Sequence, residues 1–217
     1  MVFSIPDDEI IFPDPHLGEE DGLLCVGGDL SVQRLLLAYH HGIFPWFSFR
    51  RCSQPFWYCP MQRFVIFPDE IHVSHSMRNM INRGKYRVSV NEDFSGVINH
   101  CSTAQHRNEK EGAWLGEEII KSYSELHHMG YAASVEVWDG ESLVGGLYGV
   151  TVRRCFIGES MFSLVPSASK LALISLALLL REQGWKFIDC QLETPHLRSM
   201  GARFIPYDQY MEILNAP

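Results

Sequence analysis

The sequence lacks the features that would place the chain in a membrane or a secretory pathway. Its longest apolar run, residues 171–180, is interrupted only by Ser175 and has 10 residues, whereas a membrane-spanning helix needs ~20. The first nine residues contain no basic group and no sustained apolar core, so they do not have the pattern of a secretory signal. We therefore expect a cytoplasmic protein without a membrane partner.

Paired cysteines are also lacking. The six cysteines are scattered along the chain, and none belongs to a C-x-x-C pair. No compact group of cysteine and histidine has the spacing of zinc ligands, so we expect no metal site. Three of the cysteines lie in apolar, strand-like segments, which favours buried free thiols in a reducing compartment.

Positive charge is missing from residues 1–33, which hold eight of the 26 acidic residues. The net charge of −8 argues at first against a nucleic-acid partner, but the other 18 acidic residues are balanced by 18 basic ones. Residues 71–90 contain four basic residues and no acid: Arg78, Arg83, Lys85 and Arg87. Most such patches are solvated surface, yet local potential decides whether phosphate can bind. The patch is therefore a candidate for phosphate contact.

Regular secondary structure is predicted from about residue 66 onward. Residues 1–30 are rich in Asp, Glu, Pro and Gly and are expected to be loop. The patterns predict helices at 76–83, 95–101, 117–129 and 168–183, and strands at 86–90, 133–138, 142–150, 154–161 and 186–191. We expect an α/β (α+β) fold with a small N-terminal domain, residues 1–65, and a second domain with a mixed sheet, residues 66–217.

Polar side chains occur in the two predicted strands that flank the strongly apolar helix at 168–183. Asp189 and Gln191 are two residues apart, so on a strand they point to the same face. By the same argument Glu159 shares a face with Met161. A strand–helix–strand crossover would bring these groups to strand ends, where open α/β sheets tend to place their chemistry. From spacing alone, the alternative that Asp189 and Gln191 satisfy nearby backbone groups is equally open.

The order hairpin, strand, helix, strand in residues 133–191 resembles the core of the GNAT acyltransferases. Members of that fold bind the pyrophosphate of coenzyme A at a glycine-rich loop before the central helix. The corresponding loop here, residues 163–169, has no glycine, and Pro166 has no N–H to donate. The resemblance therefore implies a GNAT-like scaffold without a coenzyme A cradle, and we expect no cofactor.

Six short sequence motifs, in a fixed order, make the resemblance more specific. They are Gly27-Gly28-Asp29-Leu30, Gly42-Ile43-Phe44-Pro45-Trp46-Phe47, Gly145-Gly146-Leu147-Tyr148-Gly149-Val150, Gly158-Glu159-Ser160-Met161-Phe162-Ser163, Ala168-Ser169-Lys170 and Ile188-Asp189-Cys190-Gln191. Together they resemble the bacterial leucyl/phenylalanyl-tRNA–protein transferases over about residues 11–214. The resemblance implies transfer of Leu, Phe or Met from aminoacyl-tRNA to the α-amino group of proteins that begin with Arg or Lys, which marks those proteins for degradation.

The resemblance also implies a catalytic set of Asp189, Gln191 and Glu159. Asp189 would orient the acceptor amine and assist its deprotonation, or would instead bind the basic residue of the acceptor. Gln191 would hydrogen-bond the ester or its developing oxyanion. Glu159 would order the 3′ adenosine or the acceptor.

A second implied set binds the aminoacyl group and the terminal adenosine: Trp46, Trp114, Tyr123, Leu147, Met161 and Ser169. Leu147 and Met161 would form an apolar pocket, and methionine adapts to both aliphatic and aromatic guests. For Met161 the alternative is an ordinary core position. Trp46 or Trp114 would stack on the adenine. Arg78, Arg83, Lys85 and Arg87 would contact tRNA phosphates.

Two other functions stay open at this point. The first is a coenzyme A-dependent N-acyltransferase of the same fold, against which the missing glycines argue. The second is a non-catalytic module that binds tRNA or peptides, against which Asp189, Gln191 and Glu159 argue. We expect an enzyme that acts as a monomer.

Overall fold

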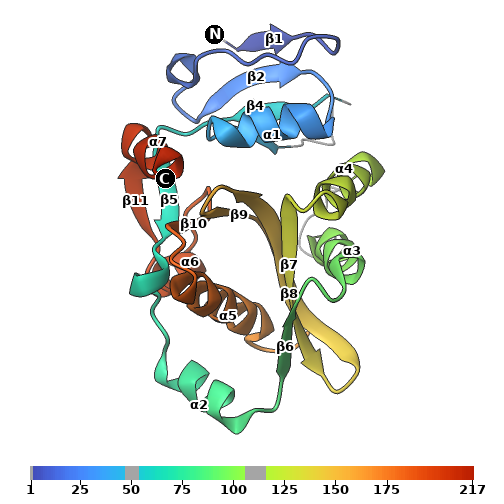
Figure 1. Ribbon diagram of the computed structural model, residues 1–217, viewed down its shortest axis with the longest axis vertical. Helices are drawn as coiled ribbons and strands as arrows, with labels where there is room; N and C mark the ends of the chain where they lie inside the picture. The colour runs from blue at the N-terminus through green and yellow to red at the C-terminus, as the bar shows by residue number, and fades with distance from the viewer. Residues whose placement is uncertain (1, 47–53, 106–115) are drawn as a thin grey trace.

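The computed structural model describes residues 2–46, 54–105 and 116–217. These residues form two β-sheets and seven α-helices, which confirms the expected α/β class (Figure 1). The smaller sheet lies at the N-terminal end of the molecule, and the larger sheet forms its body. No helix among the described residues has the length and apolar content needed to cross a bilayer.

The smaller sheet has the strand order β1-β2-β4-β3, formed by β1 (Phe3–Ile5), β2 (Leu23–Gly27), β4 (Phe56–Tyr58) and β3 (Phe44–Trp46). Helix α1 (Val32–His40) follows β2 and begins where the Ser31 side chain accepts a hydrogen bond from the Arg34 N–H. The expectation that residues 1–30 are loop was wrong, because they contain β1 and β2. Strand β1 is only three residues long and depends on a partner distant in sequence: Phe3 pairs with Cys25.

The larger sheet is mixed and has the order β11-β5-β10-β9-β8-β7-β6. Its strands are β11 (Arg203–Pro206), β5 (Gln62–Ile66), β10 (Phe187–Asp189), β9 (Cys155–Ser163), β8 (Ser142–Val152), β7 (Ala132–Asp139) and β6 (Arg87–Val90). Strands β9 and β10 are parallel and are connected by α5 (Ala168–Glu182), as the crossover pattern predicted. The other neighbouring pairs are antiparallel. The chain leaves the smaller sheet at Tyr58 and enters the larger one at Gln62.

Helices cover both faces of the larger sheet. Helices α3 (Phe94–Gln105) and α4 (Glu117–His128) lie on one face, and α5 lies on the other (Figure 1). The remaining helices are α2 (His75–Arg83), α6 (Pro195–Ser199) and α7 (Tyr207–Asn215), and two 3-10 turns occur at Pro15–Leu17 and Pro68–Glu70. The predicted helices and strands after residue 66 are thus present, with ends that differ by a few residues.

Two glycines explain how closely the helices pack on strand β8. A Cβ atom on Gly145 would lie 2.4 Å from Cβ of Ala168, at the start of α5. A Cβ atom on Gly146 would lie 3.1 Å from a methyl group of Val97 in α3 and 2.8 Å from the carbonyl oxygen of Val135. Any larger residue would therefore push a helix away from the sheet.

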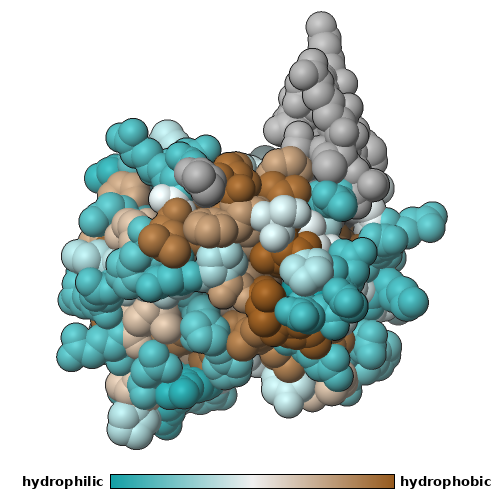
Figure 2. Space-filling model, turned by 90° about the horizontal axis from the view of Figure 1, so that it is seen from above, coloured by the Kyte–Doolittle hydropathy of each residue, from teal (hydrophilic) through white to brown (hydrophobic). Residues whose placement is uncertain are grey.

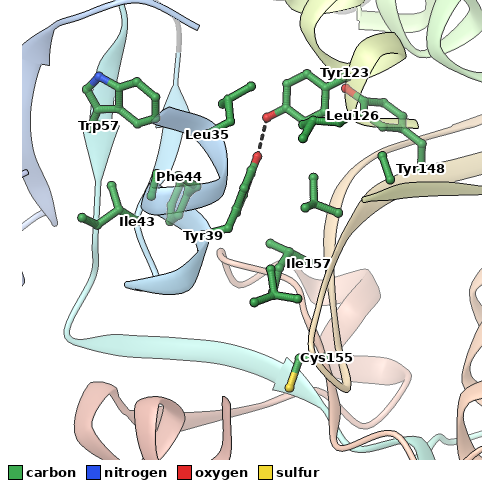
Figure 3. Close-up of a cluster of buried hydrophobic side chains, with 14 of the residues drawn as sticks. Leu35, Tyr39, Ile43, Phe44, Trp57, Tyr123, Leu126, Tyr148, Cys155 and Ile157 are labelled. Atoms are coloured by element: carbon green, nitrogen blue, oxygen red, sulfur yellow. Dashed lines mark hydrogen bonds between the residues drawn. The ribbon is translucent and has the colours of Figure 1, made fainter. Parts of the chain in front are cut away.

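One hydrophobic cluster connects the two sheets. It includes Leu35 and Trp57 from the N-terminal part and Leu126, Tyr148 and Ile157 from the larger sheet and its helices (Figure 3). A second cluster lies around α5 on the opposite face. Because the first cluster is shared, the division into domains at 1–65 and 66–217 stays a prediction.

Candidate active site

A cavity of about 250 Å³ lies where strands β9 and β10 part. Their pairing ends at Asp189 opposite Ile157, while β9 continues to Ser163. The lining combines an apolar wall with a few polar groups: Leu147, Phe156, Met161, Leu173, Leu176, Ile188 and Leu197, together with Tyr148, Gly158, Glu159, Ser160, Asp189, Cys190 and Gln191. Cavities of this composition bind small ligands or single side chains.

A β-bulge in β9 directs Glu159 away from the face predicted for it. Tyr148 pairs with Ser160 and Gly149 pairs with Gly158, so Glu159 has no opposite residue in β8. An inserted residue shifts the alternation of side chains along a strand. Glu159 therefore contacts helices α1 and α4, whereas Met161 packs in the cluster around α5. The expectation that Glu159 and Met161 share a face was wrong for this reason.

Two tyrosines and a carboxamide hydrogen-bond the Glu159 carboxylate. The Tyr39 hydroxyl donates to Oε1 at 2.7 Å, and the Tyr123 hydroxyl donates to Oε2 at 3.1 Å. The Gln191 Nε2 group donates to Oε1 at 3.4 Å. The two hydroxyl oxygens also lie within hydrogen-bonding distance of each other, so that beside the carboxylate two hydroxyl protons are shared among three contacts (Figure 3). Burial raises the pKa of Glu159 to about 7 even though the tyrosine hydrogen bonds lower it. The group can therefore change its charge near neutral pH.

Asp189 is fully buried and has protein partners for both of its oxygens. Its Oδ2 atom pairs with the Arg63 guanidinium and accepts a 3.0 Å hydrogen bond from the Tyr210 hydroxyl. Its Oδ1 atom accepts the backbone N–H of Gln191 at 2.9 Å. This side chain-to-backbone bond spans two residues and favours a turn. Strand β10 accordingly ends at Asp189, and Gln191 has a φ of 56°.

The expectation that Asp189 and Gln191 lie on the same face of one strand was therefore wrong. The turn after Asp189 replaces the last two residues of the predicted strand. It nevertheless brings the Gln191 carboxamide to Glu159. The structure thus places Asp189, Gln191 and Glu159 together, but by a turn and a bulge rather than by strand alternation.

Arg63 is a site residue that the sequence analysis missed. Its guanidinium is 1% exposed, donates to the Gly42 carbonyl and lies over the Tyr210 and Phe44 rings, at 4.4 and 5.2 Å from their centres. Burial by itself would lower its pKa, but the charge of Asp189 keeps that pKa above the ordinary arginine value. The available signal was a single arginine next to the apolar run 64–67, together with an aspartate that needs a counter-charge if it is buried.

The predicted aminoacyl- and adenosine-binding residues divide into three groups. Leu147 and Met161 line the cavity, and Tyr123 contacts Glu159. Trp46 is 41% exposed at the end of β3 and packs near Tyr58, and the described lining does not include it. Ser169 lies in the first turn of α5, also outside the described lining. Trp114 lies outside the described residues.

The predicted phosphate-binding residues lie on α2 and around β6, at the end of the molecule away from the smaller sheet (Figure 1). Arg78 and Arg83 are exposed on α2. Lys85 pairs with Asp139 at 2.9 Å, and Arg87 forms a two-pronged ion pair with Glu92. Residues 71–90 contain no acid, but in the folded chain Asp139 and Glu92 pair with Lys85 and Arg87. Most of the remaining positive charge of the patch therefore lies on α2.

The cysteines that the structure describes are free thiols, and four of these five are buried. This confirms the expectation of buried free thiols for those four, whereas Cys190 is partly exposed and Cys52 lies outside the described residues. Cys190 lines the cavity. Within the described part of the chain, no three His, Cys, Asp or Glu side chains are grouped as metal ligands would be.

The β9–α5–β10 crossover, set in a mixed sheet with a cavity where its strands part, has the topology expected of a GNAT-like fold. Comparison with sequence families identifies the protein family to which the chain belongs. A sequence-family model described as leucyl/phenylalanyl-tRNA protein transferase matches residues 65–215, and the model of that family's N-terminal domain matches residues 28–61. The chain belongs to the leucyl/phenylalanyl-tRNA–protein transferase family.

Whole-length relatives agree with this assignment. A leucyl/phenylalanyl-tRNA–protein transferase of Flavobacterium psychrophilum is 48% identical over 95% of this chain and 96% of its own length. Those of Syntrophus aciditrophicus and Azotobacter vinelandii are 50% and 44% identical, over 94% and 99% of this chain and 84% and 94% of their own lengths. A solved structure described as L-PGS from Bacillus licheniformis overlaps with a TM-score of 0.44 at 14% identity, covering 79% of this chain and 54% of its own, which is too remote to support an argument.

Proposed function

We propose that this transferase moves Leu, Phe or Met from aminoacyl-tRNA to the α-amino group of proteins that begin with Arg or Lys. The cavity between β9 and β10 carries the proposal, because it joins an apolar wall to a carboxylate and a carboxamide. We further propose that the enzyme acts as a cytoplasmic monomer and that the new N-terminus marks the product for degradation.

The reaction needs positioning and proton transfer more than a nucleophilic side chain. The acceptor amine attacks the ester carbonyl, a C–N bond forms, and the bond between the carbonyl carbon and the ribose oxygen breaks. One proton leaves the amine, and one proton joins the ribose oxygen. We assign this transfer to Glu159, since its pKa of about 7 suits a group that both accepts and donates a proton. Gln191, next to Glu159, is assigned to the ester oxygen.

Asp189 is better suited to positioning than to proton transfer. Its carboxylate is paired with Arg63 and accepts hydrogen bonds from Tyr210 and Gln191. It is also fully buried, whereas Glu159 is only partly buried. Glu159 is therefore the carboxylate of the lining that a basic acceptor can approach.

The apolar wall supports a Leu, Phe or Met donor. Leu147 and Met161 lie on neighbouring strands and pair directly across β8 and β9. Leucine and methionine side chains can adapt to a linear, branched or aromatic guest. Trp46 and Trp114 stay candidates for stacking on the terminal adenine, and Ser169 for binding near it.

The start of α5 argues against the coenzyme A alternative. The backbone N–H of Ser169 donates to the Ser163 hydroxyl at 3.1 Å, and that of Ala168 donates to the Val165 carbonyl at 3.3 Å. Two of the N–H groups that would bind a pyrophosphate are thus already used within the loop.

A transfer assay tests the proposal. Labelled Phe-tRNA or Leu-tRNA is mixed with the protein and with peptides that differ only in their first residue, Arg, Lys or Ala. We expect label in the Arg and Lys peptides and background in the Ala peptide. Transfer to none of the three would support a binding module, and transfer from acetyl-coenzyme A instead of tRNA would support the alternative enzyme.

A further inference from the structure

A buried polar network lies behind the cavity. It consists of Arg63 on β5, Tyr210 on α7 and the Asp189 carboxylate at the end of β10. Tyr210 is 0% exposed and Arg63 is 1% exposed, so neither side chain can reach a substrate in the cavity. Their shared partner Asp189 lines the cavity and connects both residues to the site.

The Asp189 carboxylate connects this network to the backbone of Gln191. Its Oδ2 atom binds Arg63 and Tyr210, and its Oδ1 atom accepts the Gln191 N–H at 2.9 Å. That N–H belongs to a residue with a φ of 56°, a left-handed conformation that residues other than glycine rarely adopt. Such a conformation persists where the surroundings fix it. The same conformation directs the Gln191 carboxamide to Glu159.

The network is expected to contribute little net stability to the fold. A buried ion pair is often no better than well-packed apolar residues, because both charges lose their hydration. The Nε–H group of Arg63 is buried and has no hydrogen-bond partner among the described residues, which adds to this cost. The arrangement does, however, fix the orientation of the Asp189 carboxylate.

We propose that Tyr210 and Arg63 are positioning residues for Gln191, which act by fixing the carboxylate of Asp189. The Tyr210 hydroxyl and the Arg63 guanidinium hold Oδ2, so that Oδ1 faces the Gln191 N–H and maintains the left-handed turn. The carboxamide then meets the ester in one orientation. This inference rests on the proposed function only in the identity of the reaction that Gln191 serves.

The first test needs no activity. Hydrogen exchange of the Gln191 backbone amide is measured by NMR in the wild type and in Tyr210→Phe, which keeps the ring over Arg63 and removes one hydroxyl. Tyr207→Phe is the matched control, since Tyr207 lies on the same helix and its hydroxyl donates to the His41 carbonyl at 2.9 Å. We expect Tyr210→Phe to speed exchange of this amide about tenfold, as expected for losing one hydrogen bond to a charged group, and Tyr207→Phe to leave it unchanged. Equal exchange rates in Tyr210→Phe and the wild type would overturn the proposal.

The second test is a double-mutant cycle on transfer. Single-turnover rates from Phe-tRNA to an Arg peptide are measured for the wild type, Tyr210→Phe, Gln191→Ala and the double variant. We expect Tyr210→Phe to lower the rate about tenfold in the wild type and to have almost no effect once Gln191 is Ala, with the KM for the peptide unchanged. The same fold-loss in both backgrounds would show a role independent of Gln191 and would contradict the proposal. If Tyr210→Phe does not fold, Arg63→Lys replaces it in both tests with the same expected outcomes, because lysine keeps a positive charge beside Asp189 and loses the planar guanidinium geometry. Absence of transfer by the wild type would reject the proposed function while the exchange test still judges the network.

Discussion

At the scale of single residues, the environment of Glu159 determines what the site can do. A carboxyl group that is hydrogen-bonded by two tyrosines and yet keeps a pKa of about 7 must be strongly affected by burial. Tyr39 comes from α1 and Tyr123 from α4, so two helices from different parts of the chain fix one side chain. This arrangement supports the proposal that Glu159 transfers a proton near neutral pH.

The pH dependence of transfer tests the role of Glu159. The raised pKa means that the proton-accepting form appears as the pH rises through about 7, so we expect the rate to rise between pH 6 and pH 8. The acceptor α-amine also titrates, at about 7.7–8.0. In Glu159→Gln the component near pH 7 should disappear and only that of the amine should remain. An unchanged profile in Glu159→Gln would remove the residue from proton transfer.

The same pKa shift affects stability with a defined sign. Between its ordinary pKa of 4.5 and about 7, Glu159 binds its proton more tightly in the folded than in the unfolded state. Its contribution to stability is therefore complete below 4.5 and is lost as the pH rises through about 7. The Glu159→Gln variant should melt with less pH dependence than the wild type over that window.

The residues of the site could be predicted from the sequence better than their geometry could. The motifs around Glu159, Asp189 and Gln191 are local, and the structure brings the three together. The bulge at Glu159 depends on its register against β8, and the turn at Gln191 depends on the carboxylate of Asp189. Arg63 could not be assigned because its partner lies 126 residues away in sequence.

At the scale of elements, we propose that α2 and β6 form the surface that contacts RNA phosphates. Arg78 and Arg83 project from α2, whereas the ion pairs of Lys85 and Arg87 reduce the charge that these two offer. Because the donor tRNAs differ in sequence, contact with phosphates alone would serve all of them.

Salt dependence measures this contact. Binding of Phe-tRNA should weaken steeply with salt, and the double variant Arg78→Ala/Arg83→Ala should reduce the slope of log K against log [salt] by about 2. Replacing Lys85 and Arg87 should change the slope less, since their charges are already paired. Arg181→Ala, an exposed arginine in the last turn of α5, is the control. A slope that does not change in the α2 variant would show that tRNA binds elsewhere.

Elements with a strong local pattern were predicted, and those that depend on distant partners were not. Helices α4 and α5 have a clear apolar face, and β7 and β8 are joined by a recognisable Asp139-Gly140 turn. Strand β1 pairs only with β2, and β11 pairs with β5 more than 130 residues before it in sequence. Such short strands form because a neighbour is present, so their own sequences contain little signal.

At the scale of the whole molecule, charge is separated along the long axis. The acidic residues of positions 1–33 are exposed on and around the smaller sheet, and the basic helix α2 lies at the other end of the molecule (Figure 1). On the face seen from above, hydrophobic residues gather in the centre between hydrophilic margins (Figure 2). A polyanion would be repelled from the smaller sheet and attracted to α2, which would orient the tRNA body as it approaches.

The most direct measurement of the central claim is the ratio of Leu to Phe transfer to one Arg-starting peptide, in the wild type and in Met161→Phe. If the cavity between β9 and β10 binds the donor side chain, the wild type transfers both, and the larger residue at 161 lowers Phe transfer more than Leu transfer. Circular dichroism and thermal melting establish that the variant is folded. An unchanged ratio with a folded variant, or no transfer to the peptide by the wild type, would contradict the account.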